Sequence, residues 1–222
     1  MPSDSFSLTS MTSEPAGYFL RPVRRGDEPA VLNLIETILR TYGIALSPSE
    51  TDSDLADLEG YYARPGAFFD VLIERTTGSI VGTVAIEPHH AGECELRKMY
   101  LRARHRGRGL GKYLLTHALH RAEALGYRRV LAGTTAVLME AITLYERFGF
   151  QHVDGPRLAG RAELTMALEI GTPTTRLRCQ LGEYELREGV EYVDFIRVHQ
   201  WLASSYWTPG IPMERVLSLI HI

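Results

Sequence analysis

Residues 104–115 read RHRGRGLGKYLL, and this stretch decides how the rest of the chain is interpreted. Three glycines, three arginines and a lysine stand directly before the apolar spacing of a helix. Glycines let backbone N–H groups approach a ligand closely, and a helix N-terminus adds about half a positive charge. The stretch therefore predicts an anion site for the phosphates of a nucleotide triphosphate, a nucleic acid or a coenzyme.

Two common phosphate-binding patterns do not fit this loop. A P-loop has a glycine five residues before its Gly-Lys pair and Ser or Thr after it, where this chain has Arg106 and Tyr113. A dinucleotide-binding loop needs a third glycine where Lys112 stands. The pattern that remains is Arg106-x-x-Gly109-x-Gly111 between a strand and a helix.

The charge of the whole chain argues against nucleic acid as the ligand. The chain has 24 Lys and Arg against 27 Asp and Glu, a net charge of −3. A nucleic-acid-binding domain is usually strongly basic, so the arginines of the loop would have to act alone. No nucleic-acid partner is expected.

The spacing of apolar residues around the loop predicts a mixed α/β protein. Residues 94–103 predict a strand that places Leu96, Lys98 and Tyr100 on one face, and the helix after the loop ends at Gly126. Asp27 is the expected cap of an early helix. The apolar face of that helix is expected to be Val31, Leu32, Ile35, Ile38 and Leu39. The other expected elements are a strand at 18–23, a short helix in 51–64, a hairpin at 67–90, a strand at 128–134, a helix at 138–150, and strands at 151–153 and 162–170.

Two motifs carry a resemblance to a known family. Arg106-x-x-Gly109-x-Gly111 after ELRKMYL, together with AITLYERFGF at 141–150, resembles the Gcn5-related N-acetyltransferase (GNAT) superfamily. The resemblance implies the GNAT fold, an α/β fold with a central mixed sheet flanked by helices, over residues 17–170. It also implies acetyl-CoA as co-substrate.

The resemblance assigns the coenzyme site to the strand and the loop. Backbone groups of Met99, Tyr100 and Leu101 would hold the pantetheine arm, and a backbone N–H near Leu101 would polarise the thioester carbonyl. The pyrophosphate would lie over the loop formed by Arg106, Gly107, Arg108, Gly109, Leu110, Gly111 and Lys112. One departure is Leu138, where many members carry asparagine, so no side-chain contact to the coenzyme is expected there.

Two residues are candidates for proton transfer. Tyr145 matches the family's tyrosine that protonates the departing thiolate, and the alternative is a tyrosine buried for packing. Glu95 stands eleven residues before Arg106, a spacing that resembles that of a general base acting through water. The alternative for Glu95 is an ion pair with Arg97 or Lys98.

The acceptor side is less sharply defined by sequence. In this fold the first two helices form it, here residues 40–64. Four acidic residues there either attract a cationic amine or cap helices, and two tyrosines are candidates to line the site: Glu50, Asp52, Asp54 and Asp57, with Tyr61 and Tyr62. The adjacent His89 and His90 do not predict a metal site, and no metal is expected. Cys94, flanked by two glutamates, is expected to be a packed residue rather than a nucleophile.

The ends of the chain are expected to lie outside the main domain. Residues 1–16 predict a disordered leader, 17–170 the acetyltransferase domain and 171–175 a linker. Residues 176–216 are expected to be the start of a second GNAT-like domain, cut short, because 193–216 resemble the opening helices of another branch of the family. The last six residues, LSLIHI at 217–222, read like a translated sequencing adapter, which implies that the gene continues.

Taken together, the sequence predicts an N-acetyltransferase that passes the acetyl group of acetyl-CoA directly to a primary amine, on a small molecule. The alternatives are a protein lysine or N-terminal acetyltransferase and a non-catalytic acyl-CoA-binding module. No apolar run approaches the roughly 20 residues that cross a bilayer, and no signal peptide is recognised, so a cytoplasmic protein without a membrane partner is expected. A homodimer stays open.

Overall fold

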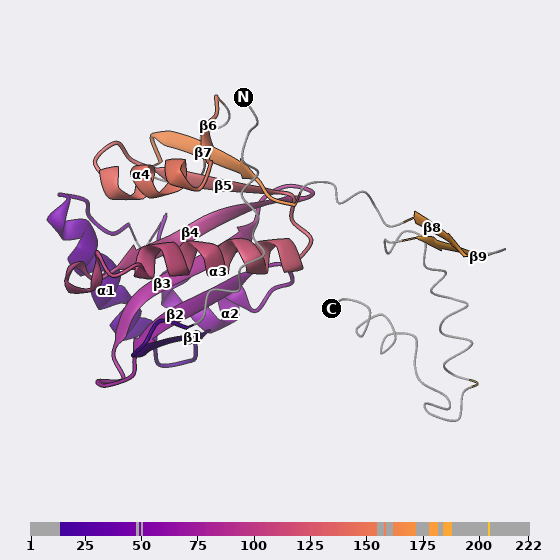
Figure 1. Ribbon diagram of the computed structural model, residues 1–222. Helices are drawn as coiled ribbons and strands as arrows, with labels where there is room; N and C mark the ends of the chain where they lie inside the picture. The colour runs from indigo at the N-terminus through magenta and orange to yellow at the C-terminus, as the bar shows by residue number, and fades with distance from the viewer. Residues whose placement is uncertain are drawn as a thin grey trace. The chain divides into compact units, whose positions relative to one another are not determined.

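The computed structural model describes residues 14–47, 49, 51–154, 158, 162–171, 178–181, 184–187 and 204. By its internal contacts the chain divides into two units, residues 1–170 and 171–222. The first unit holds the predicted strand, loop and helix around residues 94–126 (Figure 1).

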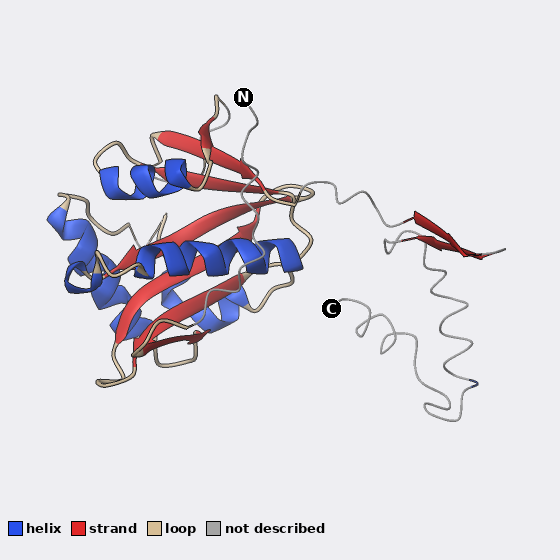
Figure 2. Ribbon diagram, viewed as in Figure 1, coloured by secondary structure: helices blue, strands red, loops and turns tan. Residues whose placement is uncertain are grey.

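The first unit is built around one mixed sheet of seven strands in the order β1-β2-β3-β4-β5-β7-β6. Figure 2 shows helices on both of its faces. The elements are β1 (Tyr18–Pro22), α1 (Glu28–Thr41), the 3-10 turn η1 (Ser53–Ala56), α2 (Leu58–Tyr62), β2 (Phe68–Glu74), β3 (Ile80–Pro88), β4 (Glu93–Leu101), the 3-10 turn η2 (Ala103–His105), α3 (Leu110–Ala124), β5 (Arg129–Thr134), α4 (Met139–Arg147), β6 (Gln151–His152) and β7 (Leu164–Glu169).

Each face of the sheet has its own core. One core packs Leu114, Ala118 and other residues of α3, with part of α4, against the strands, and the other packs α1, η1 and α2 against the opposite face. The α1 stripe differs from the expected one at Leu32, which is 37% exposed, while Leu34 is wholly buried. At 100° per residue Leu32 falls beside the buried face that Val31 and Leu34 share.

Asp27 does precede α1, but its side chain makes no capping bond to the helix. Its carboxylate instead accepts hydrogen bonds from the guanidinium of Arg21 and from the N–H of Arg24. The arginine beside it holds the pKa of the Asp27 carboxyl below its usual range. Asp27 therefore ties β1 to the turn before α1.

The partner of β4 changes along its length. β4 is antiparallel to β3 but parallel to β5, and its pairing with β5 covers only Glu93–Leu96 against Arg129–Ala132. Beyond Leu96 the two strands separate, so β4 runs on without β5 beside it. In Figure 1 the group of β5, β6, β7 and α4 opens away from β4 and α3.

A bulge in β4 sits where the separation begins. The register with β3 shifts so that Val84 faces two residues of β4, Lys98 and Met99. Lys98 has φ of +49°, a left-handed conformation that breaks the alternation of side chains. The expectation that Lys98 shares the face of Leu96 is therefore wrong: its ammonium and the Arg97 guanidinium both reach the carbonyl of Thr51.

In the second unit the described residues include an antiparallel hairpin, β8 (Arg178–Leu181) and β9 (Tyr184–Arg187). Most of the expected leader, the linker and the helices of 176–216 lie outside the described residues, as does all of 217–222. The domain division with a truncated second acetyltransferase stays a prediction. Among the described helices, none is long and apolar enough to cross a membrane.

Candidate active site

A cleft of about 590 Å³ lies between the free part of β4, the glycine loop and α4. Its floor is apolar, and Lys112, Arg106 and Arg147 bring positive charge to it. The predicted coenzyme residues that line it are Met99, Tyr100, Leu101, Arg106, Gly107, Gly109, Gly111 and Lys112. The separation of β4 from β5 therefore produces an elongated site where the sequence motifs predict one.

Two glycines give the loop its path. Gly107 has φ of +73° and Gly109, the residue before the first turn of α3, has φ of +78°. A side chain at either position would be strained, because L-residues rarely adopt this conformation. The two turns place the N-terminus of the 15-residue helix α3 at the cleft.

The charged loop residues do not all face the cleft. Arg106 donates to the carbonyl of Leu101 and to the hydroxyl of Tyr42, and its guanidinium lies 3.7 Å from Glu140. Arg108 instead donates to the hydroxyl of Tyr18 at 3.3 Å. Neither Arg108 nor Leu110 lines the cleft, and Leu110 is buried in the core. Their assignment to the coenzyme stays a prediction.

The backbone of Leu101 is oriented toward the gap. The N–H of Arg102 donates to Val81 on β3, which makes the pair of Gly82 and Leu101 a non-hydrogen-bonded one. The N–H of Leu101 consequently points away from β3, to the side from which β5 has diverged. This is the geometry that a backbone donor to a thioester carbonyl requires.

A second, smaller cavity of about 100 Å³ adjoins the cleft. Its lining includes Thr51 and Ile44, and also Thr134 at the end of β5 and Thr135 in the loop that follows. Five residues line both spaces: Met99, Tyr100, Leu138, Ala141 and Tyr145. The two cavities therefore share a boundary that includes Tyr145.

Tyr145 belongs to both a core and a site. Its ring packs against Phe150 with the centroids 5.3 Å apart, and the residue is only 6% exposed. Burial raises the pKa of its phenol, which stays protonated at neutral pH. The packing role and the proton-donor role considered from the sequence are thus compatible at one position.

Glu95 lines the smaller cavity, and its side chain is 16% exposed. Burial raises the pKa of its carboxyl to about 7, although the Arg97 guanidinium, 4.0 Å away, acts in the opposite direction. The main ionic partner of Arg97 is Glu87, and Lys98 pairs with Asp52 and Asp54. The Glu95 carboxylate is therefore left as a group that titrates near neutral pH at the cavity wall.

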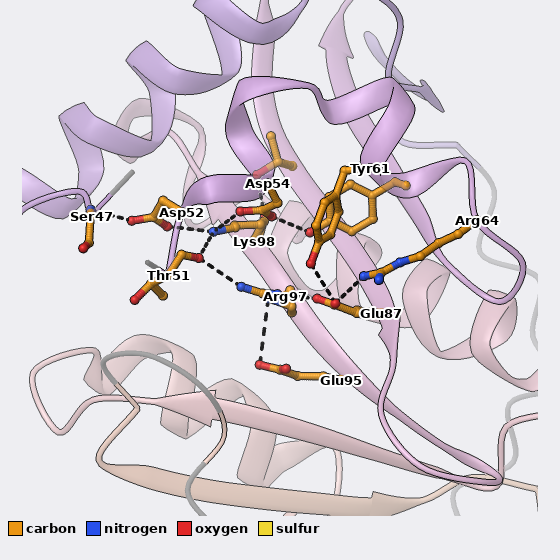
Figure 3. Close-up of polar contacts among 12 residues, drawn as sticks. Ser47, Thr51, Asp52, Asp54, Tyr61, Arg64, Glu87, Glu95, Arg97 and Lys98 are labelled. Carbon is orange, nitrogen blue, oxygen red and sulfur yellow. Dashed lines mark hydrogen bonds and ion pairs between the residues drawn. The ribbon is translucent and has the colours of Figure 1, made fainter. Parts of the chain in front are cut away.

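The sequence did not predict the hydrogen-bond network around Glu87, which pairs with Arg97 beside Glu95. Glu87 accepts hydrogen bonds from Tyr61, Arg64 and Arg97, and these contacts hold the pKa of its carboxyl low despite burial (Figure 3). No motif marks Glu87, which ends a hairpin strand as an ordinary polar residue. Its only signal is its register, because Glu87 faces Glu95 across β3 and β4.

The surroundings of Cys94 and His117 indicate structural roles for both residues. Cys94 is fully buried, which raises the pKa of its thiol to about 12, so the expectation of a packed cysteine is confirmed. The Nε2 of His117 lies 2.6 Å from the buried Asp70 carboxylate. Within the described part of the chain, no group of three or more His, Cys, Asp or Glu is arranged to hold a metal ion.

Comparison with known proteins gives the family. The model of the acetyltransferase (GNAT) family matches residues 32–150, just over half of the chain. The chain is 37% identical over 146 residues to the "Uncharacterized N-acetyltransferase YjgM" of Escherichia coli, covering 86% of that protein and 63% of this chain. It is 40% identical over 103 residues to the N-acetylaspartate synthetase of Homo sapiens, covering 33% of that protein and 46% of this chain.

Solved structures agree on the fold. An acetyltransferase of the GNAT family from Staphylococcus aureus superposes with a TM-score of 0.64 at 19% identity, over 69% of this chain and 99% of the other. A phosphinothricin acetyltransferase from Sinorhizobium meliloti in complex with AcCoA gives 0.55 at 20% identity, over 70% and 89%.

The chain therefore belongs to the GNAT acetyltransferase family. It is an N-acetyltransferase of that family, whose members use acetyl-CoA.

Proposed function

We propose that this chain transfers the acetyl group of acetyl-CoA directly to the primary amine of a small molecule, with Glu95 and Tyr145 as its acid–base residues. The observation that carries the proposal is that the two cavities share a boundary that includes Tyr145. The larger cleft has the phosphate loop at one end and the free β4 backbone along it. The smaller cavity is lined by Glu95, whose carboxyl has a pKa of about 7.

The acceptor must first lose a proton. An alkylammonium has an unperturbed pKa near 10 and no lone pair, so it cannot attack a thioester. A base with a pKa near the working pH is best suited to remove that proton, and the buried Glu95 carboxylate has such a pKa. Glu95 takes the proton, directly or through a water molecule, and the amine nitrogen then attacks the thioester carbon.

Charge then develops on the thioester oxygen and afterwards on sulfur. The N–H of Leu101 points into the gap, which supports it as the donor to the developing oxyanion. Attack of the amine forms the C–N bond and gives the tetrahedral intermediate, and its collapse re-forms the carbonyl and breaks the C–S bond. The Tyr145 phenol gives its proton to the departing thiolate, and its own proton is replaced from the amine through solvent.

The acceptor cavity supports a small molecule rather than a protein. A volume of about 100 Å³ is the space of about three water molecules. The relatives named N-acetylaspartate synthetase make an acetylated amino acid by name, which agrees with an acceptor of this size. A protein lysine would have to bring a backbone and neighbouring side chains to the same opening.

The decisive experiment measures thiol release from acetyl-CoA by the 222-residue chain in the presence of pooled small amines and, separately, of lysine peptides. Release that requires a small amine supports the proposal. Release with peptides alone would replace it by the protein acetyltransferase. Tight binding of acetyl-CoA with no release from any pool would leave the non-catalytic acyl-CoA-binding module.

The phosphate loop makes a separate prediction about coenzyme affinity. Arg106→Ala should raise KM for acetyl-CoA about tenfold with little change in kcat, because a hydrogen bond to a charged group contributes about 1.5–3 kcal/mol. S-acetylpantetheine, which lacks the phosphates, should be used equally well by both proteins. The matched control is Arg25→Ala, whose side chain is 87% exposed in the turn between β1 and α1 and does not line the cleft. An equal loss with both acetyl donors would contradict a phosphate contact.

A further inference from the structure

Lys98 has an unusual backbone and an unusual environment. Its φ of +49° makes it the one non-glycine residue with positive φ in the described part of the chain. Side chains other than glycine adopt this conformation only where the surroundings hold them in it. The Lys98 side chain is 4% exposed, although a lysine is almost never fully buried without a partner.

The ammonium of Lys98 is surrounded by three oxygens of one segment. Its Nζ donates to Asp52 Oδ1 at 2.7 Å and to the carbonyl of Thr51 at 3.1 Å, and it lies 3.0 Å from Asp54 Oδ1. Two of the three ammonium donors make hydrogen bonds, and Asp54 Oδ1, which accepts no hydrogen bond, is held by the ammonium as an ion pair. Both carboxylates are almost completely buried, at 1% and 2% exposed.

The two carboxylates extend this contact along the segment. Asp52 also accepts from the backbone N–H of Ser47 at 2.9 Å, and Asp54 accepts from the hydroxyl of Tyr62 at 2.6 Å (Figure 3). Apolar packing of Leu55 holds the far end of the same segment in the core. The Lys98 ammonium on β4 therefore holds Thr51, Asp52 and Asp54, the polar residues that it contacts in the segment 51–57.

The fixed segment contributes one residue, Thr51, to the wall of the smaller cavity. Met99, the next residue after Lys98, lines both cavities. Lys98 thus joins the acceptor wall to the bulge at which β4 turns its backbone toward the coenzyme cleft. Without the ammonium, two buried carboxylates would face each other with no cation between them, which is strongly unfavourable.

We infer that Lys98 is a positioning residue of the acceptor site: its buried ammonium holds residues 51–57 against β4, so that Thr51 stays in place as a wall of the smaller cavity, and this wall restricts the acceptor to a compact amine. The inference rests on the proposed function, since it takes the smaller cavity as the place of the acceptor. It assigns to Asp52 and Asp54 the role of holding the wall, because the Lys98 ammonium already occupies their carboxylates.

Three substitutions of Lys98 distinguish the effect of its ammonium from the effect of its backbone conformation. Lys98→Met removes the charge and keeps the length, and Lys98→Gly removes the charge while suiting the positive φ. Lys98→Arg keeps a cation. Amide hydrogen exchange of residues 51–57, measured without any substrate, should become at least tenfold faster in the first two variants and stay within about threefold of wild type in Lys98→Arg. Exchange in β2 and α3 should not change.

Kinetic measurements distinguish an effect on acceptor binding from an effect on coenzyme binding. In Lys98→Met and Lys98→Gly, KM for the small amine found in the pooled assay should rise about tenfold while the Kd of acetyl-CoA stays within twofold. Thiol release with a lysine peptide should increase relative to that with the small amine. Lys112→Met is the matched control: it removes a lysine that lines only the larger cleft, so it should weaken acetyl-CoA binding and leave exchange of 51–57 unchanged.

The outcomes are distinguishable. Unchanged exchange in folded Lys98→Met, or wild-type exchange in Lys98→Gly, would overturn the inference, since the ammonium would then not hold the wall. Equal changes in amine KM and acetyl-CoA Kd would reduce Lys98 to a residue of general stability. Should Lys98→Met fail to fold, Asp54→Asn removes one carboxylate with little change of shape, and the same faster exchange is expected. Failure of the proposed function would appear separately, as no thiol release by wild type with any amine.

Discussion

Tyr145→Phe is expected to lower kcat by about 10²–10³-fold while the Kd of acetyl-CoA changes less than twofold. Protonation of a leaving group by a positioned acid contributes about 10²–10⁴-fold to a rate. Phenylalanine keeps the packing against Phe150 and removes only the hydroxyl of a residue that lines both cavities. The rate loss should therefore appear in the chemical step, which single-turnover measurement of thiol release isolates.

A comparison of two acetyl thioesters tests whether Tyr145 acts on the leaving thiolate. An acetyl thioester with a more acidic thiol needs less protonation, so Tyr145→Phe should lose less activity with acetyl-thionitrobenzoate than with acetyl-CoA. Tyr127→Phe is the matched control, since Tyr127 is a half-buried tyrosine that donates to the carbonyl of Gly66 and lines neither cavity. An equal loss with both thioesters would contradict the role of Tyr145 as proton donor.

The sequence predicts the fold well because most of its elements have local causes. Glycines at 107, 109 and 126 determine where the loop turns and where α3 ends, and two apolar runs around the turn at 76–78 determine the hairpin. The separation of β4 from β5 could be expected only from the family resemblance. No local pattern encodes it, since it depends on how far β5 pairs with β4.

The acceptor side was less predictable for a physical reason. The conformation of Lys98 depends on a bulge, and a bulge changes the face of a side chain without changing the composition of the strand. Asp52 and Asp54 lie some 45 residues from Lys98 in sequence, and acidic residues near a helix start have a local explanation as caps. Long-range ion pairs of this kind leave no periodic signal in one sequence.

The pH dependence of the reaction should reveal Glu95. A general base acts in its deprotonated form, so kcat/KM should rise with pH up to an inflection near 7, the pKa that burial gives the Glu95 carboxyl. An unperturbed glutamate would place that inflection near 4.3. Glu95→Gln should remove the inflection and lower kcat/KM at pH 7.5 about 10²-fold, measured as thiol release across pH 5–9 with the amine in fixed excess. An inflection that persists near pH 7 in Glu95→Gln would assign it to another group.

The raised pKa of the Glu95 carboxyl also predicts that Glu95→Gln is more stable than wild type above pH 7. Because the folded-state pKa of Glu95 lies above its unfolded value, the unfolded chain binds fewer protons between about pH 4.5 and 7, and the free energy of unfolding of wild type falls over that interval. At one pKa unit per about 1.4 kcal/mol, the cost reaches about 3 kcal/mol above pH 7. Glu95→Gln carries no such cost, so its urea midpoint should match wild type at pH 4 and exceed it at pH 8. A glutamate kept for stability through Arg97 would show the reverse order at pH 8, and the two measurements together decide whether Glu95 is there for the fold or for the proton.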